Sequence, residues 1–344
     1  MPEFTAAMIG HGMVAATHLR ALHDLRDRVR LKGVLGRDPE RAAAFLDAAE
    51  VGDPRPQVYR DLAAVADDPQ VDFVLLLTPP NARAEPVAAL AGAGKAILME
   101  KPVERTTDAA RALVETCEAA GVPLGLCFQH RFREVSQILH RRLAELGPLR
   151  AVEAHVPWWR PQSYYDPPGR GTYARDGGGV LINQAVHTLD LMLWLAGPVT
   201  RVQAMATTTG FHTMEAEDFV SAGLRFANGA VGALTASTAS FPGSSESLTL
   251  HGVHGSAQLR AGVLRLDWQD GRAETLGAVG GTGGGADPMA FTHAWHRDLI
   301  ADFLEALRTG RPPAIPGRAA LATHAVIDAL TASARAGRAV EVAS

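Results

Sequence analysis

A lysine stands where two neighbouring strands are expected to end. The apolar runs 71–77 and 96–99 predict strands, and the second run leads directly into Glu100-Lys101-Pro102. Open α/β sheets bind ligands at the carboxyl ends of their strands. A lysine there can hydrogen-bond a substrate hydroxyl and share in proton transfer. We therefore predict that Lys101 acts on a substrate oxygen, on backbone fixed by Pro102, whose peptide bond can be cis.

A histidine on a predicted helix supplies a second group for proton transfer. The segment 180–195 is apolar on most sides, except where Asn183, His187 and Asp190 recur at helical spacing along one stripe. A histidine in such a place is commonly a hydrogen-bonded core residue. The asparagine one turn earlier and the glycine-rich entry, Gly177-Gly178-Gly179, favour catalysis instead. Imidazole titrates near neutral pH, so His187 can take the proton of a hydroxyl and return it in the reverse direction.

A glycine-rich loop near residue 10 matches a dinucleotide-binding pattern. Gly10-His11-Gly12-Met13-Val14-Ala15 fits G-x-G-x-x-G/A and stands between a predicted strand, 4–9, and a predicted helix, 14–25. The first glycine permits a tight turn, the second lets backbone approach a pyrophosphate, and the alanine lets helix and strand pack closely. The helix N-terminus adds N–H groups and a positive dipole. The loop predicts a site for NAD or NADP, and a tight turn without a ligand is the alternative.

The end of the second predicted strand bears on which dinucleotide is bound. An NAD site usually has an acidic residue there for the ribose hydroxyls. Here the strand 31–35 is followed by Gly36, which leaves room where that carboxylate would stand, and then by Arg37 and Asp38. Arg37 can pair with the 2′-phosphate of NADP or stack on adenine, whereas Asp38 can turn inward and serve NAD. In the alternative interpretation, Arg37 is an exposed residue and Asp38 caps a helix that begins at Pro39. These residues slightly favour NADP over NAD, but the choice between the two dinucleotides stays open.

The elements that must position these residues alternate regularly through residues 1–127. Short apolar strand-like runs alternate with alanine-rich helical stretches, which is typical of a parallel sheet covered by helices. We predict an α/β, Rossmann-type, doubly wound dinucleotide-binding domain over residues 1–127. Its expected strands are 4–9, 31–35, 71–77, 96–99 and 124–128, and its expected helices are 14–25, 39–49, 86–93 and 107–120.

Residues 128–344 predict an α+β domain for substrate binding and oligomerisation. Strand-like runs follow one another without helices, which indicates a large, mainly antiparallel open sheet. In residues 218–226 apolar and polar side chains alternate, so one face is expected to be packed and the other open to a second subunit. The expected strands are 149–156, 202–207, 218–226, 230–237 and a run over 248–266, followed by a flexible loop at 277–285 and helices at 291–307 and 318–336.

The composition argues against several classes of protein. The 344 residues fit two domains at about 150 residues each. Lys and Arg number 33 against 37 Asp and Glu, so a nucleic-acid partner is not expected. Two cysteines, no basic leader and no uninterrupted apolar span of about 20 residues predict a soluble, cytoplasmic protein without a membrane partner. The pairs His293/His296 and His251/His254 lack a third ligand at metal spacing, so no metal site is predicted.

In order and spacing, these motifs resemble those of the Gfo/Idh/MocA family of nicotinamide-dependent oxidoreductases over nearly the whole chain. The motifs are the loop 10–15, Thr78-Pro79, Glu100-Lys101-Pro102, Arg131-Phe132 and residues 177–190. In this family the lysine and the histidine flank the substrate carbon that faces the nicotinamide, which implies Lys101 and His187 as catalytic residues. The family also implies a homodimer or homotetramer. The residues assigned to cofactor binding are Gly10, His11, Gly12, Met13, Val14, Gly36, Arg37, Thr78, Pro79, Asn81, Glu100 and Lys101.

Two positions depart from the family pattern. Many members carry Asp where this chain has Asn183, and many carry His where it has Arg83. Asn183 can orient a hydroxyl but cannot act as a base, so an inositol-dehydrogenase-like triad is in doubt and the proton chemistry falls on His187 and Lys101. Arg83 indicates a changed helix start rather than a changed reaction.

The segment before the predicted catalytic helix supplies candidate substrate contacts. Residues 158–173 are dense in aromatic and hydrogen-bonding side chains. The apolar face of a sugar ring can pack on Trp or Tyr while its hydroxyls meet Arg, Asn and His, although paired tryptophans after a strand are as often core. We expect Trp159, Tyr165, Arg170 and Asn183 to contact a sugar or cyclitol, with a nucleotide-linked sugar included.

Hydride transfer between NAD(P) and a CH–OH or C=O carbon is thus the leading hypothesis, and two alternatives stay open. In one, the cofactor stays bound and transient oxidation cleaves a glycosidic bond, which gives net hydrolysis or elimination. In the other, the protein is a non-catalytic, nucleotide-sensing regulator. That class predicts loss of the lysine and the histidine, and both are present.

Overall fold

The computed structural model describes residues 2–49, 55–284 and 287–343, which fold into two compact units. The first unit comprises Met1–Glu104, Asp108–Cys127 and Thr292–Ala320, and the second comprises Arg105–Thr107, Phe128–Phe291 and Leu321–Ser344. The chain passes from one unit to the other after Cys127, where the predicted domains also meet. A segment near the C-terminus, by contrast, groups with the first unit.

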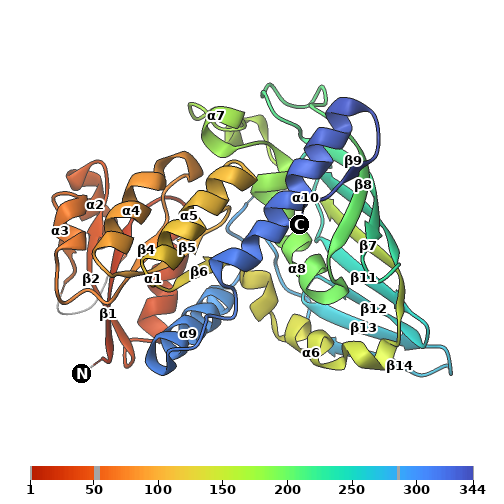
Figure 1. Cartoon of the computed structure of the whole chain (residues 1–344), viewed down its shortest axis with the longest axis horizontal. Helices are drawn as coiled ribbons and strands as arrows, with labels where there is room; N and C mark the ends of the chain where they lie inside the picture. Colours follow the sequence, from red (N-terminus) through yellow and green to blue (C-terminus); the bar gives the residue numbers. More distant parts are fainter. Residues whose placement is uncertain (1, 50–54, 285–286, 344) are drawn as a thin grey trace. The chain divides into compact units, whose positions relative to one another are not determined.

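The first unit contains the expected parallel sheet, with strands in the order β3-β2-β1-β4-β5-β6. The strand order reverses between β1 and β4, and at such a switch point doubly wound sheets bind their ligands. Figure 1 shows α1 and α9 on one face of this sheet and α4 and α5 on the other. The doubly wound fold is confirmed. The elements are β1 (Phe4–Ile9), α1 (Ala15–Asp24), β2 (Val29–Leu35), α2 (Pro39–Ala48), β3 (Gln57–Val58), α3 (Leu62–Ala66), β4 (Phe73–Leu76), η1 (Pro80–Ala82), α4 (Ala84–Gly92), β5 (Ala96–Glu100), α5 (Thr107–Ala119), β6 (Leu124–Cys127) and α9 (Ala294–Thr309).

Helix α9 completes the core of the first unit, although the sequence pattern assigns it to the second domain. The ring of Phe303 is fully buried and lies edge-on to Phe73 of β4, with 5.5 Å between the ring centroids. A Cβ atom at Gly125 of β6 would come within 2.8 Å of the Phe303 ring. Glycine therefore lets α9 pack directly on β6. This packing is long-range, and no local pattern in the sequence reports it.

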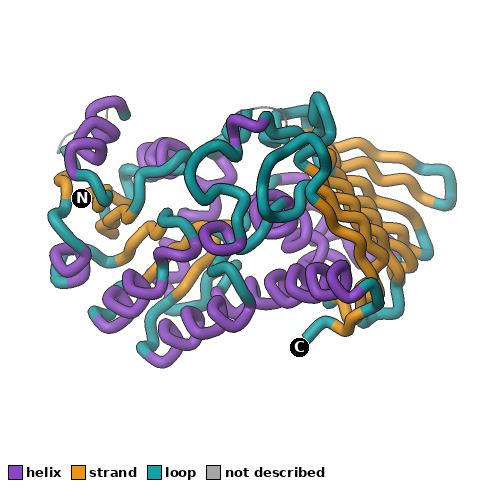
Figure 2. Tube along the Cα trace, turned by 90° about the horizontal axis from the view of Figure 1, so that it is seen from above, coloured by secondary structure: helices purple, strands orange, loops and turns teal. Residues whose placement is uncertain are grey.

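The second unit is built on a nine-stranded sheet in the order β14-β13-β12-β11-β7-β10-β9-β8-β15. Its neighbours pair antiparallel except β7 and β10, which are parallel, so the mainly antiparallel sheet is confirmed. Helices α6, α8 and α10 cover one face (Figure 1), and Figure 2 shows the other face without helices. The elements are η2 (Gln129–Phe132), α6 (Glu134–Arg142), η3 (Leu143–Leu146), β7 (Leu149–Pro157), η4 (Gln162–Tyr164), α7 (Tyr173–Asp176), η5 (Leu181–Ala185), α8 (Val186–Ala196), β8 (Val199–Thr207), β9 (Phe219–Phe226), β10 (Val231–Ser237), β11 (Ser247–Gly252), β12 (Gly255–Arg260), β13 (Val263–Trp268), β14 (Ala273–Gly277), α10 (Gly317–Ala336) and β15 (Val340–Glu341).

The run over 248–266, expected as one strand-like stretch, is three strands joined by tight turns. Between β12 and β13 the turn residues Ala261 and Gly262 have φ of 52° and 82°. Two residues with positive φ are typical of the hairpin turn that matches strand twist. Alanine does not signal such a turn, and so the sequence pattern missed it. The pattern also missed α3, α6, α7, β3, β14 and β15.

The segment Tyr173–Ala196, which contains α8, is by length and composition apolar enough to cross a membrane. In the structure 83% of its most apolar window is buried. Burial of this extent is what the core helix of a globular unit shows.

Replacing Phe303 by alanine tests the place of α9 in the core of the first unit. Loss of a buried phenylalanine that packs on β4 and β6 is expected to lower the free energy of unfolding by roughly 3–5 kcal/mol. Urea denaturation followed by circular dichroism measures the loss. Arg308→Ala is the control, because that side chain is half exposed on the same helix. If Phe303→Ala loses no more unfolding free energy than the control, α9 is not part of the core of the first unit.

Candidate active site

The loop between β1 and α1 has the backbone that a pyrophosphate requires. Gly10 has φ of +94°, and a Cβ atom there would lie 3.1 Å from the carbonyl carbon of Leu77. A Cβ atom at Gly12 meets nothing within 4 Å, so the backbone can be approached closely. Met13 beside it is half exposed, and Val14 at the N-cap of α1 makes no side-chain cap hydrogen bond. Among the residues that the structure describes, no side chain therefore caps the positive end of the α1 dipole, although the N–H groups of Ala15 and Thr17 donate to the carbonyls of Gly12 and Val14, and the loop fits a dinucleotide.

At the end of β2 a histidine ring fills the space expected to be open. A Cβ atom at Gly36 would come within 2.2 Å of the His11 ring, so glycine is needed to let that ring lie against the strand end. Burial lowers the pKa of His11, and the nearby Arg41 adds to this effect. Asp38 accepts hydrogen bonds of 3.0 and 3.2 Å from two N–H groups in the first turn of α2 and thereby caps it. Arg37 is exposed.

Arg83 joins the carboxyl ends of β4 and β5. Its guanidinium is fully buried and donates to the carbonyl of Thr78 at 2.8 and 3.1 Å and to that of Val103 at 3.3 Å. It also donates to the carbonyls of Glu100 and Pro102. Burial lowers the pKa of Arg83 to about 10. The residue also stands at the start of α4, after η1, which carries the exposed Asn81 and follows the exposed Pro79.

The Glu100 carboxylate points into the first unit rather than outward from the strand end. It accepts a hydrogen bond from His18 Nε2 of α1 at 2.9 Å, and His296 Nε2 of α9 lies 3.6 Å away. Burial acts to raise the pKa of Glu100, but the two histidines hold it well below its usual range. The carboxylate therefore anchors the end of β5 to two helices. Lys101 follows it, partly exposed, and the Lys101–Pro102 peptide bond is cis.

His18, Glu100 and Cys127 also bring three potential metal ligands within 4.8 Å of one another. Two features argue against a metal centre there. Burial raises the pKa of the Cys127 thiol, whereas a metal needs the thiolate. The buried guanidinium of Arg83 already interacts electrostatically with Glu100 and would oppose a second cation. We interpret the cluster as a hydrogen-bonded carboxylate.

His187 occupies the first turn of α8, directly after η5, a π-helical segment. Such π turns are frequent at functional sites. The imidazole is buried and stacks on His130 with 4.7 Å between ring centroids and an interplanar angle of 26°. Phe128 meets it edge-on at 6.2 Å. His187 belongs to the second unit and Lys101 to the first, and their joint action stays a prediction.

A buried carboxylate that the sequence patterns did not indicate holds the start of this helical segment. Glu217 accepts hydrogen bonds from the N–H groups of Gly179, at 3.1 and 3.2 Å, and Leu181, at 3.1 Å. Burial raises the pKa of Glu217. A Cβ atom at Gly179 would lie 1.8 Å from the Glu217 carbonyl oxygen, so only glycine fits. Thirty-six or more residues separate Glu217 from its partners, and no short motif records the contact.

The predicted polar stripe divides into three different environments. The Asn183 side chain donates to the carbonyls of Gly178 and Gly179 at 2.8 and 3.0 Å. Asp190 is fully buried and receives two hydrogen bonds from Arg131, at 2.5 and 2.7 Å. Asn183 and Asp190 therefore fix the local backbone and the neighbouring η2, while His187 lies between them among aromatic rings.

Two of the predicted substrate residues differ sharply in exposure. Tyr165 is buried, its hydroxyl hydrogen-bonds to Thr238 at 2.7 Å, and burial raises its pKa. This placement does not favour a direct substrate contact for Tyr165. Trp159 is partly exposed and packs edge-on against the exposed rings of Phe241 and Phe211, with 5.4 and 6.1 Å between centroids. Trp159 thus belongs to an exposed aromatic surface.

The neighbouring Tyr164, which was not predicted, is linked to the helical segment that leads to His187. Its hydroxyl accepts a hydrogen bond of 3.4 Å from Gln184, three residues before His187. The Arg170 guanidinium lies over the Tyr164 ring, 4.5 Å from its centroid. Arg170 and Tyr164 together therefore extend the polar surroundings of the His187 segment. The long loop that carries them gave no signal to distinguish Tyr164 from Tyr165.

Comparisons with known proteins bear on the fold and on the class of protein. Residues 4–128 match an oxidoreductase family with an NAD-binding Rossmann fold, and residues 132–258 match the GFO/IDH/MocA C-terminal domain. D-apiose dehydrogenase from Paraburkholderia graminis is 29% identical over 99% of this chain and 90% of that protein. Inositol 2-dehydrogenase from Rhizobium meliloti is 25% identical over 98% of both chains. The WlbA dehydrogenase of Bordetella pertussis, solved in complex with NADH and UDP-GlcNAcA, aligns over 99% of both chains with a TM-score of 0.82 and 27% identity.

The substitution Glu100→Gln tests the buried carboxylate through the pH dependence of stability. Because the folded pKa of Glu100 lies below its usual value of 4.5, the carboxylate stabilises the fold above about pH 4.5 and loses this effect as the pH falls through the folded value. At neutral pH we expect the variant to be less stable by roughly 1–3 kcal/mol, and the difference to shrink in more acidic solution. Urea midpoints over a pH series measure it, with the exposed Glu85→Gln as control. A deficit that does not change with pH would contradict the assignment.

Proposed function

The chain belongs to the Gfo/Idh/MocA family of NAD-binding oxidoreductases, and from this premise we propose that it transfers a hydride to or from a sugar, cyclitol or sugar derivative. The family contains dehydrogenases of sugars and cyclitols. The observation that carries the proposal is that this chain matches both domains of the family and keeps Lys101 and His187 within its motifs.

The residues that would hold the dinucleotide lie at the carboxyl edge of the first unit's sheet. The loop Gly10–Val14 would receive the pyrophosphate on its backbone, at the positive end of the α1 dipole, and Arg37 would lie near the adenosine. When bound, the nicotinamide supplies or accepts the hydride. The chain's own residues then have to hold the substrate oxygen and manage its proton.

We assign that proton to His187 and the orientation of the oxygen to Lys101. A buried imidazole braced by aromatic rings has one orientation and can take a proton from a hydroxyl. The ammonium group of Lys101 would stabilise negative charge that develops on the oxygen. Asn183 cannot act as a base, and its amide is engaged with the backbone of Gly178 and Gly179.

For the substrate we propose a carbohydrate or cyclitol bound beside α8. Arg170 and Tyr164 supply hydrogen-bonding groups next to Gln184 of the catalytic segment. Trp159 supplies an exposed aromatic face of the kind that packs on sugar rings. The names of the relatives fit this class, since they include dehydrogenases of apiose and inositol.

We further propose a homodimer or homotetramer formed through the open face of the nine-stranded sheet, in the cytoplasm. The apolar side chains of Met205, Phe219 and Val231 are exposed on adjacent strands of that face. Exposed apolar side chains gathered on one face are typical of a protein–protein interface. The unbonded, buried cysteines Cys117 and Cys127 fit a reducing compartment.

Between the two dinucleotides we propose a preference for NADP. The end of β2 carries the exposed Arg37, while the Asp38 carboxylate is committed to capping α2. A guanidinium recognises a phosphate by paired, charge-assisted hydrogen bonds. Arg41, close enough to His11 to influence its pKa, adds a second positive charge at this edge.

The variants Lys101→Ala and His187→Ala test the proposed function. In a panel of sugars, cyclitols and nucleotide sugars followed at the nicotinamide absorbance, the wild-type protein should show substrate-dependent change, and each variant should lower kcat by roughly 10²- to 10⁴-fold. Fluorescence titration should show that both variants still bind the dinucleotide. The exposed His254→Ala is the control. If both variants keep their activity, Lys101 and His187 are not the catalytic residues. If the protein keeps its cofactor tightly bound and the nicotinamide absorbance shows no net change, redox-assisted bond cleavage is favoured instead.

The variant Arg37→Ala tests the choice of dinucleotide. Loss of a charge-assisted contact with the 2′-phosphate is expected to raise the Kd for NADPH by roughly 10- to 100-fold and to leave the Kd for NADH nearly unchanged. Fluorescence titration with both dinucleotides measures the ratio. Arg20→Ala, an exposed arginine of α1, serves as the control. An equal loss of affinity for both dinucleotides would refute a role in selecting the phosphate.

A further inference from the structure

A second histidine lies directly against His187. His130, in the 3-10 turn η2, stacks on the His187 ring with 4.7 Å between centroids. Both side chains are buried, and both belong to the second unit. A positive charge on His130 would oppose the arrival of a proton on His187, because like charges at this distance disfavour one another strongly when buried. The protonation state of His130 therefore matters to any proton chemistry at His187.

A guanidinium determines which nitrogen of His130 carries the proton. Arg133 Nη2 lies 2.6 Å from His130 Nε2. A guanidinium only donates hydrogen bonds, so Nε2 of His130 has to be the acceptor. If His130 were doubly protonated, its Nε2–H would face the N–H of Arg133 Nη2, and neither group could accept a hydrogen bond from the other. The geometry thus keeps His130 uncharged, with its single proton on Nδ1.

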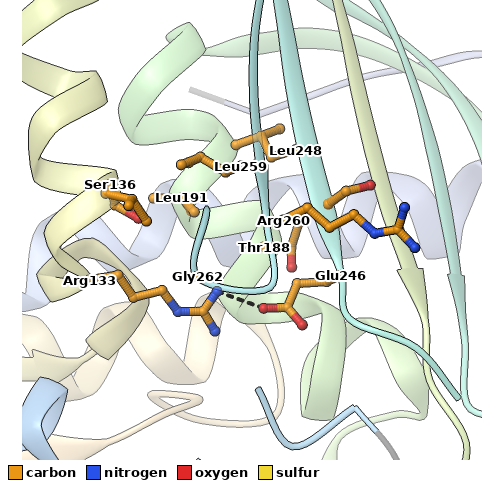
Figure 3. Close-up of a pocket in the computed structure, with 11 residues that line it drawn as sticks. Arg133, Ser136, Thr188, Leu191, Glu246, Leu248, Leu259, Arg260 and Gly262 are labelled. Carbon is orange, nitrogen blue, oxygen red and sulfur yellow. Dashed lines mark hydrogen bonds and ion pairs between the residues drawn. The ribbon is translucent and has the colours of Figure 1, made fainter. Parts of the chain in front are cut away.

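A buried carboxylate holds Arg133 in this position. Glu246, directly before β11, accepts a hydrogen bond of 2.6 Å from Arg133 Nη1 and one of 3.2 Å from Trp158 Nε1. Figure 3 shows Arg133 and Glu246 paired at the wall of a pocket that Thr188, the residue after His187, also lines. The ion pair is nearly inaccessible to solvent. Removal of one partner of such a pair leaves an uncompensated buried charge.

We infer that Glu246, Arg133 and His130 form a positioning relay, in which an anchored guanidinium holds an uncharged ring against the proton-transferring His187. The inference rests on the proposed function in that it takes His187 as the group that handles the proton. The other charged groups on η2 and α8 are Arg131 and Asp190, which neutralise each other in a bidentate pair. Phe128, the second ring against His187, carries no charge. Because the relay keeps His130 uncharged, His187 can take up a proton without repulsion from a positive charge on the neighbouring ring.

The test reads the ring protonation of both histidines by nitrogen-15 NMR of labelled protein, with signals assigned by their loss in His130→Phe and His187→Ala. In the wild-type protein we expect His130 to stay neutral, with its proton on Nδ1, from about pH 5.5 to about pH 8.5. The double variant Arg133→Gln/Glu246→Gln removes both charges together, so neither is left buried alone. There His130 is expected to take up a proton within this range.

The pH–rate profile supplies the second readout. In the double variant the limb that reports His187 should move to lower pH by roughly one to three units, because a charged ring now opposes its protonation. Adding His130→Phe keeps a stacked ring that cannot titrate, and should return the limb to its wild-type position. A purely structural role for the ion pair would not be rescued in this way. Arg142→Gln/Glu274→Gln, which removes an ion pair at the far end of α6, is the matched control and should leave the profile unchanged.

The outcomes separate this inference from the proposed function. A doubly protonated His130 in the wild-type protein, or a double variant whose profile does not respond to His130→Phe, overturns the relay even if His187→Ala is inactive. Full activity of His187→Ala overturns the role of His187 and with it the functional meaning of the relay. The NMR result on His130 would still establish the neutral ring in that case.

Discussion

Buried polar groups have to find partners within the protein, and the surroundings of Lys101 and of His187 both depend on how this constraint is met. In the first unit the buried guanidinium of Arg83 donates to carbonyls of the segments that end β4 and β5. In the second unit the carboxylate of Glu217 accepts from the N–H groups that begin the helical segment of His187. One buried charge in each unit thus fixes the backbone on which Lys101 and His187 stand.

The surroundings of His187 extend the same constraint from backbone to side chains. Arg131 is paired with Asp190, and Arg133 is paired with Glu246, so each of these four buried charges has a partner of opposite sign. Such pairs add little net stability, because desolvation offsets much of their attraction, but they fix geometry. The His187 ring itself contacts the rings of His130 and Phe128. The charged residues next to His187 are therefore paired with one another, which fits the proton transfer that we propose for this side chain.

The sequence predicted the features that local patterns record. Gly10 to Ala15 stood out because a fixed spacing of small residues is required there. Apolar runs gave most strands and helices of the first unit to within a few residues, but the short β3 and α3 were missed. Glu217 and His130 could not be found in this way, because their contacts join segments far apart in the chain and need no fixed spacing. For the same reason α9 was assigned by its position in the chain, whereas Phe303 packs on β4 and β6.

The structure also accounts for the asparagine that departs from the family pattern. The Asn183 amide donates to the carbonyls of Gly178 and Gly179, at the turn where Gly179 passes directly over the backbone of Glu217. An ionised aspartate has no donor and would face those carbonyls with negative charge. The amide therefore suits a tight glycine turn whose N–H groups are already taken by a carboxylate. The Asn183 side chain thus stabilises the turn, which is consistent with our proposal that His187 and Lys101 handle the proton chemistry.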